Sequence, residues 1–207
     1  MIFNSTCSQQ LDGKWILKEV GYKEFKKNIG LQILNIEDGK AGLFTDLQLV
    51  KSELDLKVKD SSLILENGEK YSDFKVIDNN LLRLFIQGTS NEDQVEMEMD
   101  FVRLLPTKTD FSQEKIESLR FEFQEKGKLK TIIAFNQELW NKNELEKLEM
   151  KEGSRWIIEK LETIYFITNY NCGRKGVSLP ISEVNEDLLK FYGVPNESGE
   201  VIATRAE

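Results

Sequence analysis

Apolar residues at every second position dominate the chain from Trp15 to about Leu104. Successive side chains of a β-strand point to opposite faces, so this alternation gives each strand one apolar and one polar face. The segment Leu54-Asp-Leu56-Lys-Val58 follows the pattern, and Val95-Glu-Met97-Glu-Met99-Asp-Phe101 follows it over a longer run. The sequence therefore predicts half-buried strands.

Turn residues separate these apolar runs. Asp38-Gly39, Asn67-Gly68 and Asp78-Asn79-Asn80 combine small or amide side chains that tolerate positive φ angles. We therefore expect an antiparallel meander. Its strands are predicted near residues 13–20, 30–37, 41–49, 53–59, 62–66, 70–77, 81–87 and 94–104.

A meander of short strands exposes two unpaired edges unless it closes on itself. The predicted fold class is all-β and mainly antiparallel, as a barrel or a strongly curved meander. A barrel of about eight strands has an interior that side chains nearly fill, or that accepts one small apolar ligand. The inward residues are bulky, which favours a filled core, although methionine side chains are flexible and can move to accommodate a ligand.

The polar segment from Pro106 to Asp110 interrupts the alternation, which resumes at Leu119-Arg-Phe121-Glu-Phe123. The expected organisation is a flexible lead at 1–10, a barrel at 11–105, a linker at 106–112 and a second β-rich domain at 113–207. Two hairpin-like patterns recur further along: Leu63 aligns with Leu148 and Leu31 with Leu119, shifts of 85 and 88 residues. A degenerate second copy of the meander and coincidence explain these matches equally well.

One segment near the end of the chain has helical periodicity. Val184, Leu188 and Phe191 are spaced i, i+4 and i+7, and Ser182 precedes them as a capping hydroxyl. This spacing predicts a short amphipathic helix over 183–192, and a last strand is expected at 201–204.

The start Leu11-Asp-Gly13-Lys-Trp15-Ile-Leu17 and the later Phe101-Val-Arg103-Leu104 resemble the lipocalin-like small β-barrel domains of bacterial envelope proteins. In that family a glycine and a tryptophan open the first strand at the closed end, and an arginine on the last strand packs over the indole. Gly13, Trp15 and Arg103 match these roles, and the resemblance covers residues 11–105.

The resemblance implies a non-enzymatic binding protein of the cell envelope or the secreted space, with a cytoplasmic location as the alternative. Its partner would be a small apolar ligand or another protein.

Two cysteines, Cys7 and Cys172, are too few for a disulfide framework and have no companions for a zinc site, although they could form one bridge. Cys7 and the polar segment before it resemble the start of a bacterial lipoprotein, in which this cysteine carries the lipid. In that pattern a small residue precedes the cysteine, whereas Thr6 stands there in this chain. Lipidation and an ordinary tail cysteine are the two alternatives. No apolar run approaches the ~18 residues that span a bilayer, so no transmembrane segment is expected.

Histidine is absent, which removes the commonest general base and the commonest metal ligand. The sequence also contains no catalytic or phosphate-binding motif, so neither an enzyme nor a bound cofactor or metal is expected. A net charge of −8 has the wrong sign for nucleic acid binding.

The same acidity supports an alternative function, an immunity or inhibitor protein that masks a cationic enzyme or toxin. Glu96, Glu98 and Asp100 form an acidic stripe on one predicted strand. Such a stripe would steer a basic partner toward the protein. The sequence leaves open the ligand, the partner and the oligomeric state.

Overall fold

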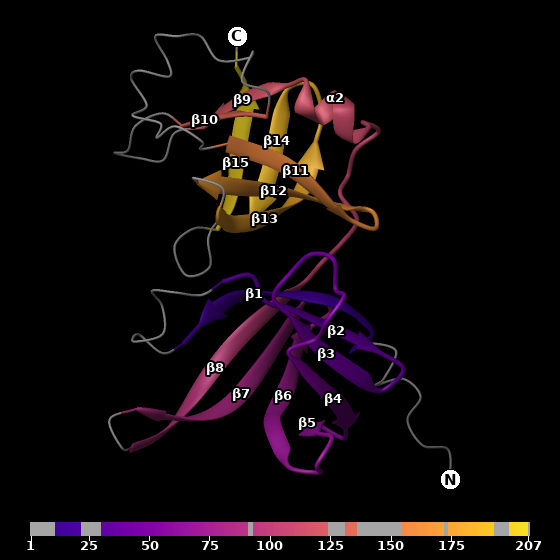
Figure 1. Cartoon of the computed structure of the whole chain (residues 1–207), viewed down its shortest axis with the longest axis vertical. Helices are drawn as coiled ribbons and strands as arrows, with labels where there is room; N and C mark the ends of the chain where they lie inside the picture. Colours follow the sequence, from indigo (N-terminus) through magenta and orange to yellow (C-terminus); the bar gives the residue numbers. More distant parts are fainter. Residues whose placement is uncertain are drawn as a thin grey trace. The chain divides into compact units, whose positions relative to one another are not determined.

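The computed structural model describes residues 11–21, 30–90, 93–123, 131–135, 155–171, 174–192 and 199–206. The chain divides into two compact units, Met1–Leu104 and Leu105–Glu207. Both consist of antiparallel strands, which confirms the predicted all-β fold class (Figure 1).

The first unit is a closed barrel of eight strands in sequence order. Its strands are β1 (Gly13–Val20), β2 (Ile33–Glu37), β3 (Lys40–Phe44), β4 (Leu54–Lys59), β5 (Ser62–Leu65), β6 (Lys70–Asp78), β7 (Leu81–Ser90) and β8 (Asp93–Arg103). Each strand pairs with the next one, and β1 also pairs with β8, which closes the barrel. Closure pairs the first strand with the last along the barrel wall, where an open sheet would have two unpaired edges.

The barrel interior holds a core of large apolar side chains. Trp15, Leu63 and Phe101 are almost completely buried, with exposed fractions of 0%, 0% and 1%. The other buried members come from β1, β2, β3, β4, β6 and β7 and from the segment before β1: Leu11, Leu17, Val20, Leu34, Ile36, Ala41, Leu56, Phe74, Leu82 and Leu84. The alternation in the sequence thus becomes one inward-facing cluster.

The predicted third strand ended too late, because β3 stops at Phe44. Asp46 Oδ1 accepts a hydrogen bond from the main-chain N–H of Leu49 at 2.9 Å, which closes a turn. Leu49 itself has a positive φ of 50°. Leu47 is buried although it lies in this loop, so it anchors the loop where the pattern suggested a strand.

The second unit is a sheet of seven strands, which agrees with the second β-rich domain expected from the sequence. The strands are β9 (Arg120–Phe123), β10 (Thr131–Ala134), β11 (Arg155–Leu161), β12 (Ile164–Asn171), β13 (Arg174–Val184), β14 (Leu188–Tyr192) and β15 (Glu200–Arg205). Their order is β10-β9-β15-β14-β13-β12-β11. The first strand pairs with the last, as in the barrel, but among the described residues β10 and β11 do not pair.

The topology does not support the shift of 88 residues as a strand-for-strand duplication. That shift aligns Leu31, next to β2, with Leu119, next to β9. However, β9 pairs with the last strand of its sheet, a role that β1 has in the barrel. The glycine of the second copy, Gly127, lies outside the described residues.

The segment predicted as a linker belongs to the second unit. The buried Thr107 hydroxyl donates to the carbonyl of Ile181 at 2.8 Å and accepts from the N–H of Tyr165 at 2.9 Å. Lys108 forms a parallel bridge with Glu183 of β13. The interruption at Pro106 therefore lies close to the unit boundary, but the residues that follow it are bound to the sheet.

The predicted helix over 183–192 is wrong. β13 continues to Val184, and β14 starts at Leu188 after a turn. Asn185 Oδ1 accepts from the N–H groups of Asp187 and Leu188, at 2.9 and 3.1 Å, and this side chain closes the hairpin turn. Leu189 and Phe191 are the buried residues of β14, so the segment follows a period of two.

The last strand was predicted correctly within two residues at 201–204, as β15 covers Glu200–Arg205. A short helix occurs elsewhere, α2 (Gln113–Glu117), with Ser112 Oγ accepting from the N–H of Lys115 at 3.3 Å. Its buried residue Ile116 packs into the core of the second unit. No helix in the described part of the chain has the length and apolar character needed to cross a bilayer.

Candidate functional site

One end of the barrel is closed by an arginine over a tryptophan. The Arg103 guanidinium carbon lies 4.0 Å from the centroid of the Trp15 ring. Its Nη1 donates to the carbonyl of Asp12 at 2.6 Å and its Nε to the carbonyl of Asn79 at 2.8 Å. Trp15 Nε1 donates to the carbonyl of Leu11 at 2.9 Å. These contacts join both ends of the sheet to the β6–β7 turn.

Gly13 makes this arrangement possible. Its φ of +136° is outside the range of ordinary L-residues, and a Cβ atom there would lie 2.6 Å from Arg103 Nη1. The three residues singled out by the resemblance therefore meet at one place, where their contacts hold the closed end of the barrel together.

The opposite end of the barrel is the one at which the odd-numbered strands β1, β3, β5 and β7 end. The even-numbered strands β2, β4, β6 and β8 begin there. Here the inward apolar side chains are only partly buried, although they pack against the core. We call this set the mouth: Leu43, Leu54, Leu65, Tyr71, Ile86 and Met99. Two further partly buried members of the core, Val58 and Val76, lie near the hairpins at the other end.

Two hydroxyl groups adjoin the mouth on β6. Burial raises the pKa of the Tyr71 phenol. The next residue, Ser72, has an exposed fraction of 2%, and its Oγ has no hydrogen-bond partner. Ser72 is the register partner of Leu63 on β5, so this hydroxyl lies in an apolar layer of the barrel.

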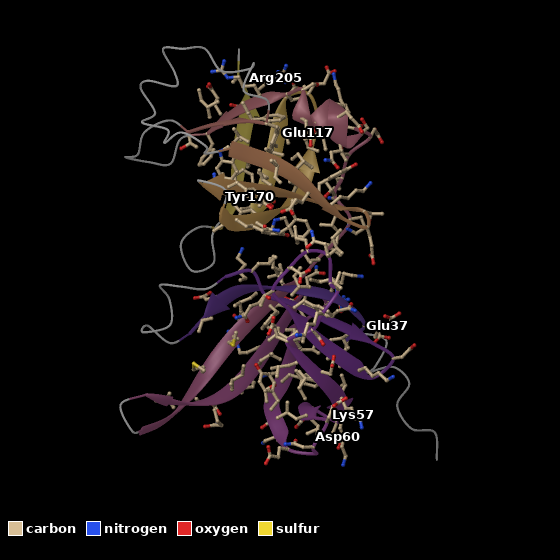
Figure 2. All side chains as sticks on the ribbon, in the orientation of Figure 1. Glu37, Lys57, Asp60, Glu117, Tyr170 and Arg205 are labelled. Carbon is tan, nitrogen blue, oxygen red and sulfur yellow. The ribbon has the colours of Figure 1, made fainter. Side chains whose placement is uncertain are left out.

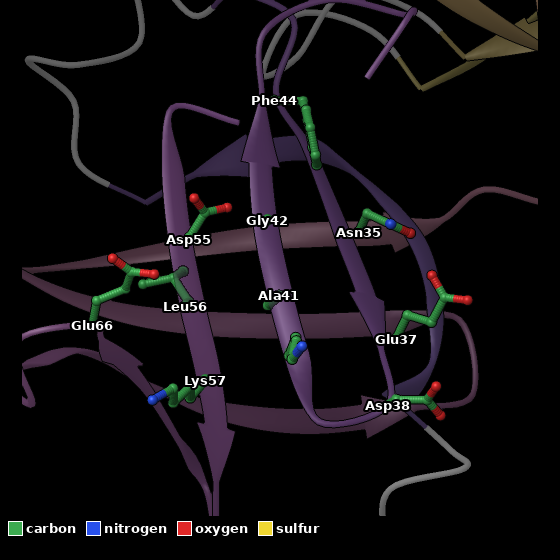
Figure 3. Close-up of a pocket in the computed structure, with 11 residues that line it drawn as sticks. Asn35, Glu37, Asp38, Ala41, Gly42, Phe44, Asp55, Leu56, Lys57 and Glu66 are labelled. Carbon is green, nitrogen blue, oxygen red and sulfur yellow. The ribbon is translucent and has the colours of Figure 1, made fainter. Parts of the chain in front are cut away.

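A separate hollow of about 590 Å³ lies on the outer face of β2, β3 and β4 (Figure 3). It is a surface of the first unit, and Figure 2 shows Glu37 and Lys57 on the outside of the barrel. The lining consists of polar side chains around a small floor: Asn35, Glu37, Asp38, Lys40, Ala41, Gly42, Phe44, Asp55, Leu56, Lys57 and Glu66.

Strand register explains how these residues come together. Gly42 of β3 pairs with Asn35 of β2 and with Asp55 of β4, so the three form one row across the sheet. Phe44 lies on the same face as Gly42, and a Cβ at position 42 would be 2.7 Å from its ring. The glycine therefore leaves room for the aromatic ring over the middle strand.

The acidic stripe lies on β8 and runs beyond the barrel wall. β6 pairs with β7 as far as Phe85, and β1 pairs with β8 as far as Met99. The Gly21 N–H still donates to the Glu98 carbonyl at 2.8 Å. Further along, the described residues of β7 and β8 pair only with each other, as the ribbon that projects in Figure 1. Glu96 belongs to this ribbon and is exposed.

Two of the three stripe carboxylates share one arginine. Arg83 Nε and Nη2 donate to the two oxygens of Asp100 at 2.6 and 2.9 Å, and Arg83 Nη1 lies 2.6 Å from Glu98. These carboxylates raise the pKa of Arg83, Asp100 most strongly through its hydrogen bonds. Gln87 Nε2 donates to Glu96 at 3.0 Å. The stripe is therefore partly neutralised by the neighbouring strand.

A polar network in the second unit was missed by the sequence interpretation. Thr168 donates to Glu159 and is 2.9 Å from the Ser178 hydroxyl, while Lys175 Nζ lies 2.8 Å from Glu159. The residues stand on three neighbouring strands, β11, β12 and β13, so only the register brings them together. Every member has a partner, as a structural network requires.

The structure gives no geometry for the cysteine sites expected from the sequence. Cys7 and Cys172 lie outside the described residues, so neither lipidation nor a bridge is addressed by the fold. Within the described ranges, no three carboxylate or thiol side chains gather as metal ligands would.

The mouth and the hollow were also absent from the sequence interpretation. The mouth could have been found as the last inward residue of each strand before the loops of one end. The hollow could not, because its lining depends on register between strands. Comparison with protein-family models and with curated proteins finds no match for this chain.

Proposed function

We propose that the protein is a non-enzymatic binding protein that takes a small apolar ligand at the mouth of the barrel. The observation that carries this proposal is the difference between the two ends of the core. Trp15 is fully buried at the closed end, where two core side chains, Val58 and Val76, are partly exposed, whereas six core side chains at the mouth keep part of their surface exposed. Covering such surface with a ligand is favourable by about 25 cal/mol per Å².

The chemistry of the mouth favours an apolar ligand. Five of its six side chains are purely apolar, and the sixth, Tyr71, offers one hydroxyl. The flexible side chain of Met99 can change rotamer, which helps a site to accommodate a ligand. Small-molecule sites are commonly concave and apolar with few polar groups. The lipocalin-like resemblance of residues 11–105 agrees with this proposal.

The test uses the full chain and the uncharged fluorescent probe N-phenyl-1-naphthylamine. We expect saturable uptake with one site, detected as an increase in probe emission. Leu54→Gln and Leu65→Gln place amides at the mouth, where we expect the affinity to fall at least tenfold. Ile77→Gln changes an apolar residue that is 43% exposed and lies away from the mouth, so it should leave the affinity unchanged.

Circular dichroism of each variant separates loss of binding from loss of fold. No saturable uptake by the natural sequence would reject the proposal. Equal losses in the Ile77 variant and in the mouth variants would place the probe elsewhere on the protein.

A second candidate function is the acidic immunity or inhibitor protein, which the exposed Glu96 and the half-exposed Glu98 favour. Surface carboxylates of this kind accelerate association with a basic partner and lose that effect in salt. The Glu96→Lys/Glu98→Lys variant would abolish capture of a cationic enzyme on this model. If the protein instead binds an apolar ligand, the same variant would take up the probe at the mouth as well as the natural sequence does.

The compartment is also part of the proposal. The resemblance to envelope proteins and the lead-in before Cys7 favour the periplasm or an attached lipoprotein. Incorporation of an alkyne-labelled palmitate in bacterial cells tests this point. Label on the natural chain and none on Cys7→Ser would support the lipid anchor, whereas an unlabelled natural chain would remove it.

A further inference from the structure

The hollow on β2, β3 and β4 is independent of the mouth, because its charged lining side chains stand on the outer face of the barrel. Its volume of about 590 Å³ lies within the range of roughly 300–1,000 Å³ of small-molecule sites. Its lining contains four carboxylates and two lysines, a composition that does not suit an apolar ligand.

Two lysines occupy opposite positions on neighbouring strands in this hollow. Lys40 and Lys57 are register partners on β3 and β4, so their Cβ atoms lie about 5 Å apart. Like charges in directly opposite positions destabilise a sheet. Neither ammonium has an ion-pair partner in the described part of the chain, even though Glu37 is the register partner of Lys40 on β2. The lysine side chain is long and flexible, so two ammonium groups that start from opposite positions can turn to share one anionic group of a ligand.

Two carboxylates lie further along the hollow. Asp55 precedes Lys57 by two residues on β4, a separation of roughly 7 Å along a strand. Glu66 directly follows β5 at Leu65, which pairs with Leu56, so it adjoins Asp55. Figure 3 shows Asp55 and Glu66 on the same part of the hollow and Lys57 below them on β4.

Gly42 lies between these two groups, and the Phe44 ring takes the space that a side chain at position 42 would need. It pairs with Asp55 and stands two residues from Lys40 on β3, and it contributes no side chain to the lining. Phe44 borders the hollow beyond it. A ligand lying along β3 and β4 would therefore contact the lysines with one part and the carboxylates with another.

We propose that this hollow binds a small zwitterion. Lys40 and Lys57 hold its anionic group, a carboxylate or a phosphate, and Asp55 and Glu66 hold its ammonium group. The charged lining sums to −2, from Glu37, Asp38, Asp55 and Glu66 against two lysines. This excess of carboxylates opposes simple anions, and the lysine pair opposes simple amines at its own end.

The test compares ligands that carry both charges with ligands that carry one. Isothermal titration of the full chain uses phosphoethanolamine and 4-aminobutanoate as zwitterions, and inorganic phosphate and ethylamine as single-charge probes. We expect at least one zwitterion to bind ten times more tightly than either single-charge probe. Binding should shift the amide signals of Gly42 and Lys57 in ¹⁵N NMR spectra.

Variants locate the site. Lys57→Gln and Asp55→Asn should each weaken zwitterion binding at least tenfold. Lys59→Gln is the matched control, since Lys59 is exposed on the same strand and face but lies outside the lining. Uptake of the apolar probe at the mouth should stay unchanged in all three variants, so failure here and failure of the proposed function are distinguishable.

Vesicles separate two sources of the same chemistry. Binding to phosphatidylethanolamine vesicles beyond that to phosphatidylglycerol vesicles would assign the ligand to a lipid headgroup. Binding of the free zwitterion without vesicle binding would assign it to a soluble molecule. The proposal is overturned if no zwitterion binds in either form, if phosphate or ethylamine binds equally well, or if the Lys59 variant loses as much affinity as the Lys57 variant.

Discussion

The Arg103 guanidinium lies over the Trp15 ring at 4.0 Å, and these two residues are also register partners on β8 and β1. The contact therefore stands where the barrel closes, between the first strand and the last. Because the same guanidinium donates to the carbonyls of Asp12 and Asn79, one side chain holds three segments that are far apart in the sequence.

Replacement of Arg103 should destabilise the barrel. Arg103→Leu removes the cation–π contact and both charged hydrogen bonds, so we expect the free energy of unfolding to fall by about 2–4 kcal/mol. Arg103→Lys keeps the charge but loses the planar fork, and about half of that loss is expected. Urea unfolding, followed by the NMR signal of the Trp15 indole N–H group, measures this change in the free energy of unfolding. Lys75→Ala, at an exposed position of β6, is the control, and an Arg103→Leu variant as stable as this control would contradict the prediction.

A side chain at position 13 should conflict with the same arginine. Gly13→Ala combines an unfavourable φ of +136° with a Cβ contact of 2.6 Å to Arg103, and a loss of about 2–4 kcal/mol is expected. In the Arg103→Leu background the added loss should be smaller, because the nearest atom is gone. Gly39→Ala tests the φ effect alone, since its φ is +74° but no atom lies within 4 Å. Additive effects of the Gly13 and Arg103 variants would show that the contact is unimportant.

Removal of the Ser72 hydroxyl should stabilise the barrel. The group is buried without a partner, which costs about 1–3 kcal/mol, so Ser72→Ala is expected to raise the free energy of unfolding by about 1 kcal/mol. Ser62→Ala should have the opposite effect, because Ser62 donates to Asp73 at 2.6 Å. A destabilised Ser72→Ala variant would contradict the prediction and show that the hydroxyl makes a hydrogen bond.

Acid should weaken the second unit through Glu183. The hydrogen bond from Lys190 Nζ, 2.7 Å long, lowers the pKa of Glu183 below its ordinary value of 4.5 and raises the pKa of Lys190. A carboxyl with a lowered folded-state pKa stabilises the protein above its unfolded pKa, and this contribution is lost as the pH falls from 4.5 through the folded value.

NMR titration of the Glu183 side-chain carbonyl measures this pKa directly. In Lys190→Gln we expect the pKa of Glu183 to move up toward 4.5, and the stability near pH 4 to depend less on pH. An unchanged titration curve would show that Lys190 does not set it.

Local pattern was sufficient to predict the elements of the barrel. β1 occupies the predicted residues, and β4 and β5 differ from the prediction by one residue each. These strands could be predicted because alternation along one strand places each side chain on the inner or the outer face of the sheet, whichever strand is its partner. At 183–192 the same kind of reasoning failed, because the Asn185 side chain closes a turn and the β13 and β15 neighbours of β14 override the helical spacing.

The sequence by itself determined that the chain forms curved antiparallel sheets, which follows from the period of two and from the turn residues. It also pointed to Gly13, Trp15 and Arg103, whose roles depend on residue type. Only the tertiary structure decided that the first sheet closes, that Arg83 shares the charge of Glu98 and Asp100, and that Lys40 and Lys57 are register partners. The reason is register: these relationships join residues on different strands, and hydrogen bonding between strands is set by the whole sheet.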